Sequence, residues 1–191
     1  MNDIIKNSLK NSLETHRKLL QDDQIHDNII FITRLCLDAF ESDNKLLLCG
    51  NGGSASDAQH IASELSGRFY KDRSPLNAQA LHVNTSYMTA VANDYGFSKT
   101  YERSVQAFGK KGDILIGIST SGNSSNVINA IKIAKEKKLV TVGFTGIDGG
   151  KLNDICDHII KIPSNDTARI QEGHILIGHI MCELIEKSLF S

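Results

Sequence analysis

The sequence predicts an α/β fold: a three-layer αβα sandwich with a five-stranded parallel sheet, preceded by two N-terminal helices. Five short apolar runs alternate with helical segments along the 191 residues. The runs are nearly continuous in apolar residues, which is typical of parallel strands buried on both faces. Two of the runs end in turns rich in glycine or serine, at the sheet edge where parallel folds bind ligands.

Helical periodicity opens the chain. Between residues 3 and 20, and again between 25 and 40, apolar residues recur at spacings of three and four. These two helices precede the first strand, so they cannot be crossovers within the sheet. We expect residues 1–42 to be a helical extension of a single domain spanning 1–191, packing outside the sheet at a subunit interface.

The first strand, its turn and the following helix form the central unit. Residues 46–49 read as a strand, 50–53 as a turn of glycines and one asparagine, and Ser54 as the N-cap of a helix over 55–65. The free N–H groups at the start of that helix favour an anion, typically a phosphate.

His60 and Glu64 lie four residues apart on the same predicted helix, so both side chains project from one face. An imidazole and a carboxylate in this arrangement suit acid–base chemistry or metal binding. The unit therefore combines a phosphate cradle with a reactive pair.

The later elements continue the alternation. We expect strands over 78–83, 113–118, 139–144 and 158–162, helices over 86–92, 98–108, 123–138, 149–156 and 167–189, and a polar loop over 93–97.

A second candidate phosphate loop follows the strand over 113–118. Residues 119–124 read Ser-Thr-Ser-Gly-Asn-Ser and offer four hydroxyls and several turn amides, without the lysine of a P-loop. This composition suits a phosphate monoester on a small molecule better than a nucleoside triphosphate.

A dinucleotide site is the competing interpretation of the first turn, because Gly50, Gly52 and Ala55 formally satisfy its glycine fingerprint. The acidic residue that binds the ribose should end the next strand. That strand ends instead in Val83, Asn84 and Thr85, which argues against a nucleotide cofactor.

Polar groups interrupt the apolar terminal helix. Gln171 and His179 are eight positions apart and share a broad face, about 12 Å apart along the axis. Gly173 and Gly178 indicate close packing or ligand approach. His174 points elsewhere and is expected to be a partly exposed or hydrogen-bonded structural residue.

Composition excludes several classes of protein. The chain has 21 basic and 22 acidic residues and a formal net charge of -1, so no global field favours nucleic acid or an anionic membrane. No stretch approaches 18 apolar residues and no export signal is visible, so we expect a cytoplasmic protein. The four cysteines lack CxxC spacing and read as buried thiols.

Four segments together carry a resemblance that covers essentially the whole chain: CGNGGSASDAQHIASELSGR, VANDYGF, GISTSGNSSNVI and DTARIQEGHILIGHIMCELIE. They resemble the phosphoheptose (sedoheptulose 7-phosphate) isomerases of the sugar isomerase (SIS) superfamily. The resemblance implies a SIS-type, flavodoxin-like fold, a homotetramer with active sites between subunits, and one zinc ion per subunit.

Matching the motifs residue by residue implies the site. Glu64 would be the catalytic base and His179 the catalytic acid, and zinc would be held by His60, Glu64, Gln171 and His179. The residues implied to contact substrate are Asn51, Gly52, Gly53, Glu64, Asn93, Asp94, Ser119, Thr120, Ser121, Ser124 and Gln171.

Converting a 2-ketose phosphate to an aldose phosphate moves a proton between C1 and C2 through an enediol, which needs a base and a proton-exchanging acid. Zinc would either stabilise the enediolate or fix the site. Two alternatives stand beside this isomerase: a non-catalytic SIS adaptor that binds a replication-initiator protein, and an isomerase or etherase acting on another sugar phosphate.

Overall fold

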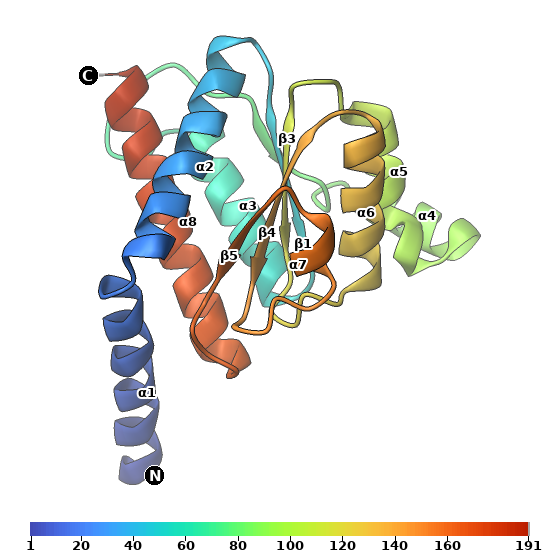
Figure 1. The fold of residues 1–191 in the computed structure, drawn as a ribbon. Coiled ribbons are helices and arrows are strands. Elements are labelled where there is room, and N and C mark those ends of the chain that lie inside the picture. Colours follow the sequence, from blue (N-terminus) through green and yellow to red (C-terminus); the bar gives the residue numbers. More distant parts are fainter. Residues whose placement is uncertain (191) are drawn as a thin grey trace.

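A five-stranded, all-parallel sheet lies between two layers of helices in the computed structural model, which describes residues 1–190 (Figure 1). The strand order is β2-β1-β3-β4-β5. This is the doubly wound order in which the chain reverses direction between β1 and β3, the position where such folds bind ligands. The predicted fold class is confirmed.

The strands alternate with helices along the whole chain. The strands are β1 (Leu46–Gly50), β2 (Ala78–Ala80), β3 (Ile114–Ile118), β4 (Val140–Thr145) and β5 (His158–Lys161). The helices are α1 (Asn2–Leu20), α2 (Asp23–Glu41), α3 (Gly53–Ser66), α4 (Thr85–Tyr95), the 3-10 turn η1 (Phe97–Lys99), α5 (Thr100–Phe108), α6 (Ser125–Glu136), α7 (Leu152–Ile155) and α8 (Thr167–Leu189).

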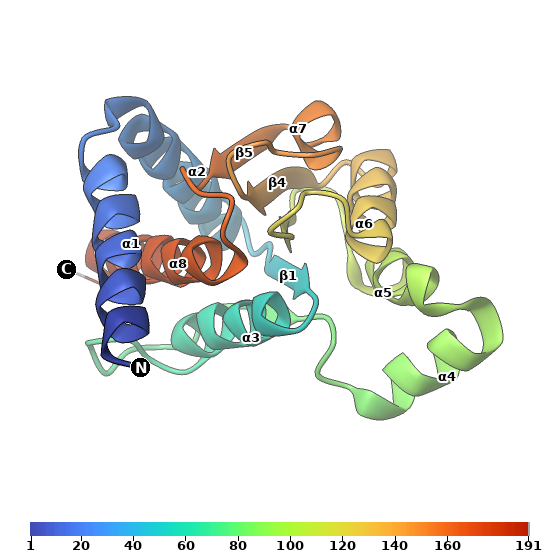
Figure 2. The same ribbon diagram turned by 90° about the horizontal axis from the view of Figure 1, so that it is seen from below.

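The side chains on the two faces of β1 pack into two separate apolar cores. Leu46 and Leu48 pack with α2, α3 and α8, whereas Leu47 and Cys49 pack with α5 and α6. This alternation is why the strand is apolar at every position. Helices α3 and α8 consequently lie side by side on one face of the sheet (Figure 2).

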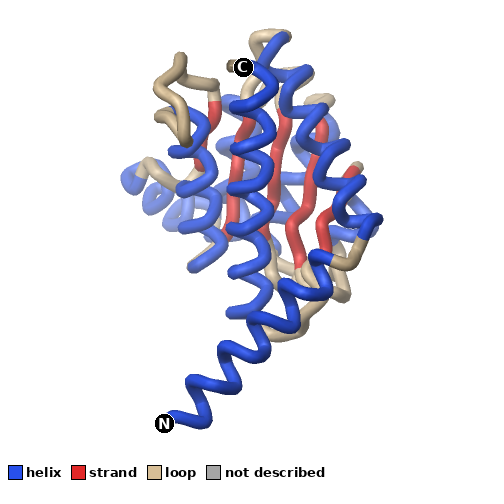
Figure 3. Tube along the Cα trace, turned by 90° about the vertical axis from the view of Figure 1, so that its left-hand side faces the viewer, coloured by secondary structure: helices blue, strands red, loops and turns tan. Residues whose placement is uncertain are grey.

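Helix α1 packs against α8 but extends well beyond the sheet (Figure 3). Helix α4 packs mainly against η1 and α5 and stands away from the sheet (Figure 2). Within residues 1–190, no helix has the length and hydropathy needed to span a bilayer.

Several predicted boundaries were wrong. Ser54 is not an N-cap, because the helix already begins at Gly53 and Gly52 occupies the cap with a φ of 56°. The expected loop over 93–97 is largely the last turn of α4, which ends at Tyr95. The strand expected over 78–83 stops at Ala80, where the chain turns toward the Asn84 cap of α4.

The short helix expected over 149–156 begins only at Leu152. Gly149 and Gly150 have φ values of 75° and 53°, a left-handed backbone that a right-handed helix cannot contain. Helix α6 likewise begins at Ser125 rather than at Asn123.

Candidate active site

Two loops meet where β1 and β3 end. Gly50 and Ile118 are paired neighbours in the sheet, so the turn after each strand opens at the same edge. The side-chain amides of Asn51 and Asn126 donate to each other's oxygens at 2.8 and 2.9 Å and join the first turn to the start of α6. The Tyr101 hydroxyl donates to the carbonyl of Gly50 and supports the first turn from the other core.

The serine-rich loop is held by its own hydroxyls. Ser119 Oγ lies 3.0 Å from Ser124 Oγ, and the backbone N–H of Asn123 donates to Ser121 Oγ. Gly122 has a φ of 65°, and a Cβ there would meet the backbone of Gly149. The loop is therefore a built turn, tightly packed against the loop after β4.

A polar hollow of about 340 Å³ lies beside this turn. It is lined by residues from the loops after β3, β4 and β5 and from the first turn of α8: Thr120, Ser121, Asn123, Gly146, Ile147, Asp148, Asn165, Thr167 and Ile170. Two of the predicted substrate-binding residues, Thr120 and Ser121, face it.

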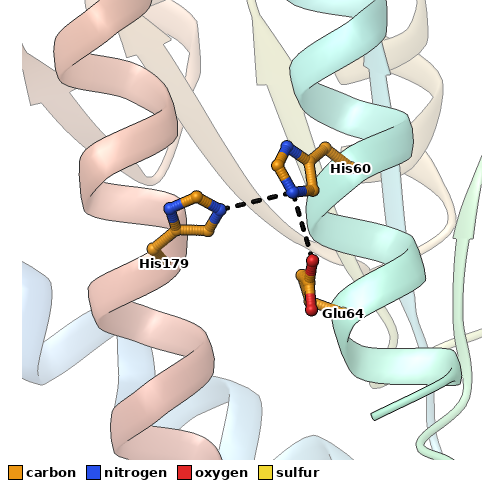
Figure 4. Close-up of side chains that lie close together, drawn as sticks. All are labelled: His60, Glu64 and His179. Atoms are coloured by element: carbon orange, nitrogen blue, oxygen red, sulfur yellow. Dashed lines mark hydrogen bonds and ion pairs between the residues drawn. The ribbon is translucent and has the colours of Figure 1, made fainter. Parts of the chain in front are cut away.

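Histidines and a carboxylate from α3 and α8 converge (Figure 4). His60 Nε2 lies 3.1 Å from Glu64 Oε1 and 3.4 Å from His179 Nε2. One potential ligand atom from each residue lies within 4.8 Å of the others. Side-chain exposure is 48% for His60 and 23% for Glu64, so the cluster opens to solvent.

The geometry of this cluster fits a metal ion. Imidazole nitrogen and carboxylate oxygen bind zinc at about 2.0–2.2 Å, which puts neighbouring tetrahedral ligands roughly 3.3 Å apart. The two spacings from His60, 3.1 and 3.4 Å, match that value, and the third, between Glu64 and His179, is at most 4.8 Å. His60, Glu64 and His179 can therefore hold a metal ion as three ligands.

Gln171 lies elsewhere on α8. Its side-chain amide covers Gly53 at the start of α3, where a Cβ would come within 2.5 Å of Nε2. His60 is seven residues further along α3, about 10 Å by helical rise. Gln171 thus lies at the turn after β1, and its role as a fourth metal ligand stays a prediction.

Asn93 and Asp94 are exposed in the last turn of α4, with Asn93 donating to Asp94 at 2.8 Å. Helix α4 stands apart from the loops after β1 and β3 (Figure 2). Within one chain the structure leaves these two residues separate from the cluster on α3 and α8.

The glycines of α8 pack as expected. A Cβ on Gly178 would come within 2.5 Å of Ile61 on α3, and one on Gly173 within 2.8 Å of Ile162. His174 is fully buried rather than partly exposed, and its Nε2 lies 3.1 Å from the carbonyl oxygen of Thr145. The hydrogen-bonded part of that prediction is confirmed.

Sequence reasoning missed four residues around the site. Burial raises the pKa of Asp57, one turn before His60, to about 6, although His60 opposes the shift. The Phe69 ring stacks on His179 with centroids 5.8 Å apart. Arg73 and Asn126 contact the site through hydrogen bonds whose geometry no local sequence pattern predicts: Arg73 bonds Glu64 and the distant Glu186, and Asn126 bonds Asn51.

Comparison with known proteins places this chain in a family. The model of the SIS domain family matches residues 10–146. The chain belongs to the SIS domain family. A phosphoheptose isomerase from Clostridium acetobutylicum is 50% identical over 190 residues, covering 100% of this chain and 97% of that relative.

Solved structures agree. A phosphoheptose isomerase from Neisseria gonorrhoeae has a TM-score of 0.91 and 40% identity, covering 97% of this SIS domain chain and 98% of its own. One from Francisella tularensis has a TM-score of 0.93 and 34% identity, covering 97% of each chain. Within the SIS family the chain groups with these enzymes, and it is an isomerase.

Proposed function

We propose that this isomerase converts D-sedoheptulose 7-phosphate to D-glycero-D-manno-heptose 7-phosphate, as a source of heptose for surface polysaccharides such as lipopolysaccharide core or capsule. The observation that carries the proposal is the convergence of His60, Glu64 and His179 on two neighbouring helices. The family shared with phosphoheptose isomerases supports the choice of substrate.

The phosphate would bind where the loops after β1 and β3 meet. Glycine amides at the start of α3 and serine hydroxyls at the start of α6 present donors to an anion there. We assign substrate contacts to Asn51, Gly52, Gly53, Ser119, Thr120, Ser121, Ser124 and Gln171. Binding energy from this remote phosphate would favour the transition state, so a substrate without phosphate should lose rate as well as affinity.

Glu64 would move the proton between C1 and C2. Its Oε1 faces His60 at 3.1 Å, and we assign Oε2 to the carbon-bound proton. Removal of that proton from C1 of the ketose gives an enediol, and its return to C2 gives the aldose. His179 would exchange protons with the two sugar oxygens during this transfer.

We propose zinc as the metal, held by His60, Glu64 and His179 with Gln171 as a fourth ligand. Two imidazoles and a carboxylate form a donor set that zinc favours. When bound, zinc would supply Lewis-acid stabilisation for the enediolate oxygens. Metal analysis of protein purified without added metal should give about one zinc per chain, and a value near zero with full activity would remove zinc from the mechanism.

We further propose a homotetramer with active sites between subunits, in which residues 1–42 extend a single domain. The apolar face of α1 and the open side of His60 support this arrangement. Asn93 and Asp94, distant from the cluster in their own chain, would then reach a neighbour's site. Four free thiols suit a reducing compartment, and we place the reaction in the cytoplasm.

Incubation with sedoheptulose 7-phosphate, followed by detection of the aldose, tests the proposal. Glu64→Gln should lower kcat by roughly 10²- to 10⁴-fold, because the amide cannot accept the proton. Glu183→Gln is the matched control and should leave turnover unchanged. Glu183 lies one turn beyond His179 on α8 and forms an ion pair with Lys187.

Unchanged turnover in Glu64→Gln would refute the assignment of the base. A parent protein with no turnover would refute the isomerase proposal for this substrate, and would favour another sugar phosphate or a non-catalytic adaptor.

A further inference from the structure

A buried carboxylate on α8 organises the segment that follows α3. Glu186 is 2% exposed. Its Oε1 accepts from the backbone N–H groups of Tyr70 and Lys71 at 2.9 Å, and its Oε2 accepts from that of Phe69 at 3.2 Å. Burial raises the pKa of Glu186, but these three N–H donors and Arg73 outweigh it and hold the pKa below its usual range.

Arg73 connects this carboxylate to the end of α3. Its Nε lies 3.1 Å from Glu186 Oε2, and the two side chains are 2% and 3% exposed. The guanidinium also donates to the carbonyl oxygens of Glu64 and Leu65, each at 2.8 Å. These carbonyls belong to the last turn of α3, which has no further N–H groups of its own to satisfy them.

Arg73 and Glu186 each connect through a hydrogen bond to the cluster of His60, Glu64 and His179 or to a residue that contacts it. One partner of Arg73 is the backbone of Glu64 itself. Glu186 lies two turns beyond His179 on α8 and fixes the backbone of Phe69, whose ring stacks on the His179 imidazole. The network therefore ties the last turn of α3 to α8 next to the place where the three side chains meet.

We propose that Arg73 and Glu186 form a positioning latch, which sets the separation and register of α3 and α8 and thereby the distances among His60, Glu64 and His179. Neither residue touches the reacting atoms. The part of the inference that concerns metal affinity rests on the metal site proposed above. A planar guanidinium presents its N–H donors in a wide, fixed fork that reaches one carboxylate and two carbonyls, whereas a lysine carries its three donors on a single nitrogen.

Two substitutions test the latch, with zinc affinity and turnover as separate measurements. Glu186→Gln removes the charge and one acceptor, and Arg73→Lys keeps the charge but loses the fork. Groups that orient metal ligands typically contribute 10- to 100-fold to affinity. In chelator competition on the folded apoprotein, each variant should raise the zinc Kd by about that factor and lower kcat, while KM stays within about twofold.

Asp113→Asn is the matched control. Asp113 is fully buried, pairs with Lys45 at 2.7 Å, and accepts from the N–H groups of Lys45 and Lys110. These partners lie outside α3 and α8. The control should lose thermal stability much as Glu186→Gln does, yet keep the parent's zinc Kd and kcat.

Zinc affinity and kcat at parental values in both folded latch variants would overturn the proposal, because the pair would then be structural only. If Glu186→Gln fails to fold, the zinc Kd and kcat of Arg73→Lys alone test the proposal. A parent that turns over sugar without binding zinc would refute the metal site alone. The latch would then be tested by the kcat of the two variants relative to the parent. A parent that shows neither property would refute both proposals.

Discussion

His174 combines full burial with a single hydrogen bond. Its Nε2 lies 3.1 Å from the Thr145 carbonyl and must carry the proton, which leaves Nδ1 deprotonated. That Nδ1 is buried without a partner among the described residues. Burial lowers the pKa of His174 to about 4, although the bond to Thr145 opposes the shift.

The depressed pKa predicts an acid-sensitive contribution to stability. The unfolded chain binds a proton at His174 near pH 6.5, whereas the folded chain resists it until about pH 4. The contribution is complete above pH 6.5 and is lost as the pH falls to 4, about 3 kcal/mol in all. Urea unfolding of the parent and of His174→Gln across this range should show the parent's advantage shrinking by that amount; parallel profiles would contradict it.

At the scale of single residues, local spacing predicted which side chains lie together on the same helix. His60 and Glu64 follow from the four-residue helical repeat, and they do lie 3.1 Å apart. The reciprocal amides of Asn51 and Asn126 come from a turn and a helix 75 residues apart, so no local sequence window contains both. Pairings of this kind depend on the sheet order, which composition does not encode.

Helix packing depends on a missing side chain. Gly178 brings α8 so close to α3 that a Cβ would lie 2.5 Å from Cδ1 and 2.6 Å from Cγ1 of Ile61. Ile61 is 3% exposed and has little freedom to yield. The glycine therefore sets the spacing between the two helices that carry the site.

Gly178→Ala should lower the free energy of unfolding by about 1–3 kcal/mol, since overpacking outweighs the gain in helix propensity. Zinc affinity should also fall, because His179 is the next residue. Ile61→Ala alone should also be destabilising, but the double variant should lose less stability and less zinc affinity than the sum of the two single variants, which chemical denaturation and chelator competition would measure. Strictly additive effects of the two substitutions would contradict the contact.

At the scale of elements, apolar runs predicted all five strands. The errors were in element boundaries, at positions where backbone conformation determines where a strand ends or a helix begins. The edge strand β2 stops at Ala80 although Leu81 and Val83 continue the β-like pattern, because the Asn84 side chain caps α4 by accepting from Tyr87 N–H at 3.0 Å. Left-handed glycines delay α7 in the same way. The sequence pattern shows where apolar residues lie, but not where the chain must turn.

At the scale of the whole molecule, an apolar face of α1 has no partner among residues 1–190. Ile5, Leu9, Leu13 and Leu20 share a side of α1 and are 59–75% exposed. Beside them, an apolar groove of about 310 Å³ runs between α1, α2 and α8, lined by residues that include Leu19, Ile29 and Ile180. Exposed apolar faces of this kind mark association surfaces.

Replacing Leu9 and Leu13 by aspartate should dissociate the proposed tetramer, because a buried charge without a partner is costly. Sedimentation velocity should show a smaller species, with turnover reduced if the sites need two subunits. Asn7→Asp, on another face of α1, serves as the control and should keep the parental assembly. An unchanged sedimentation coefficient in the double variant would contradict the interface.

The position of α8 in the chain has a consequence for biosynthesis. His60 and His179 are 119 positions apart, and the second belongs to a 23-residue helix that follows all five strands. During translation the ribosome therefore releases the loops after β1 and β3 and the α3 half of the cluster well before the α8 half exists. The activity proposed for this cluster accordingly requires that the segment containing α8 has emerged and docked.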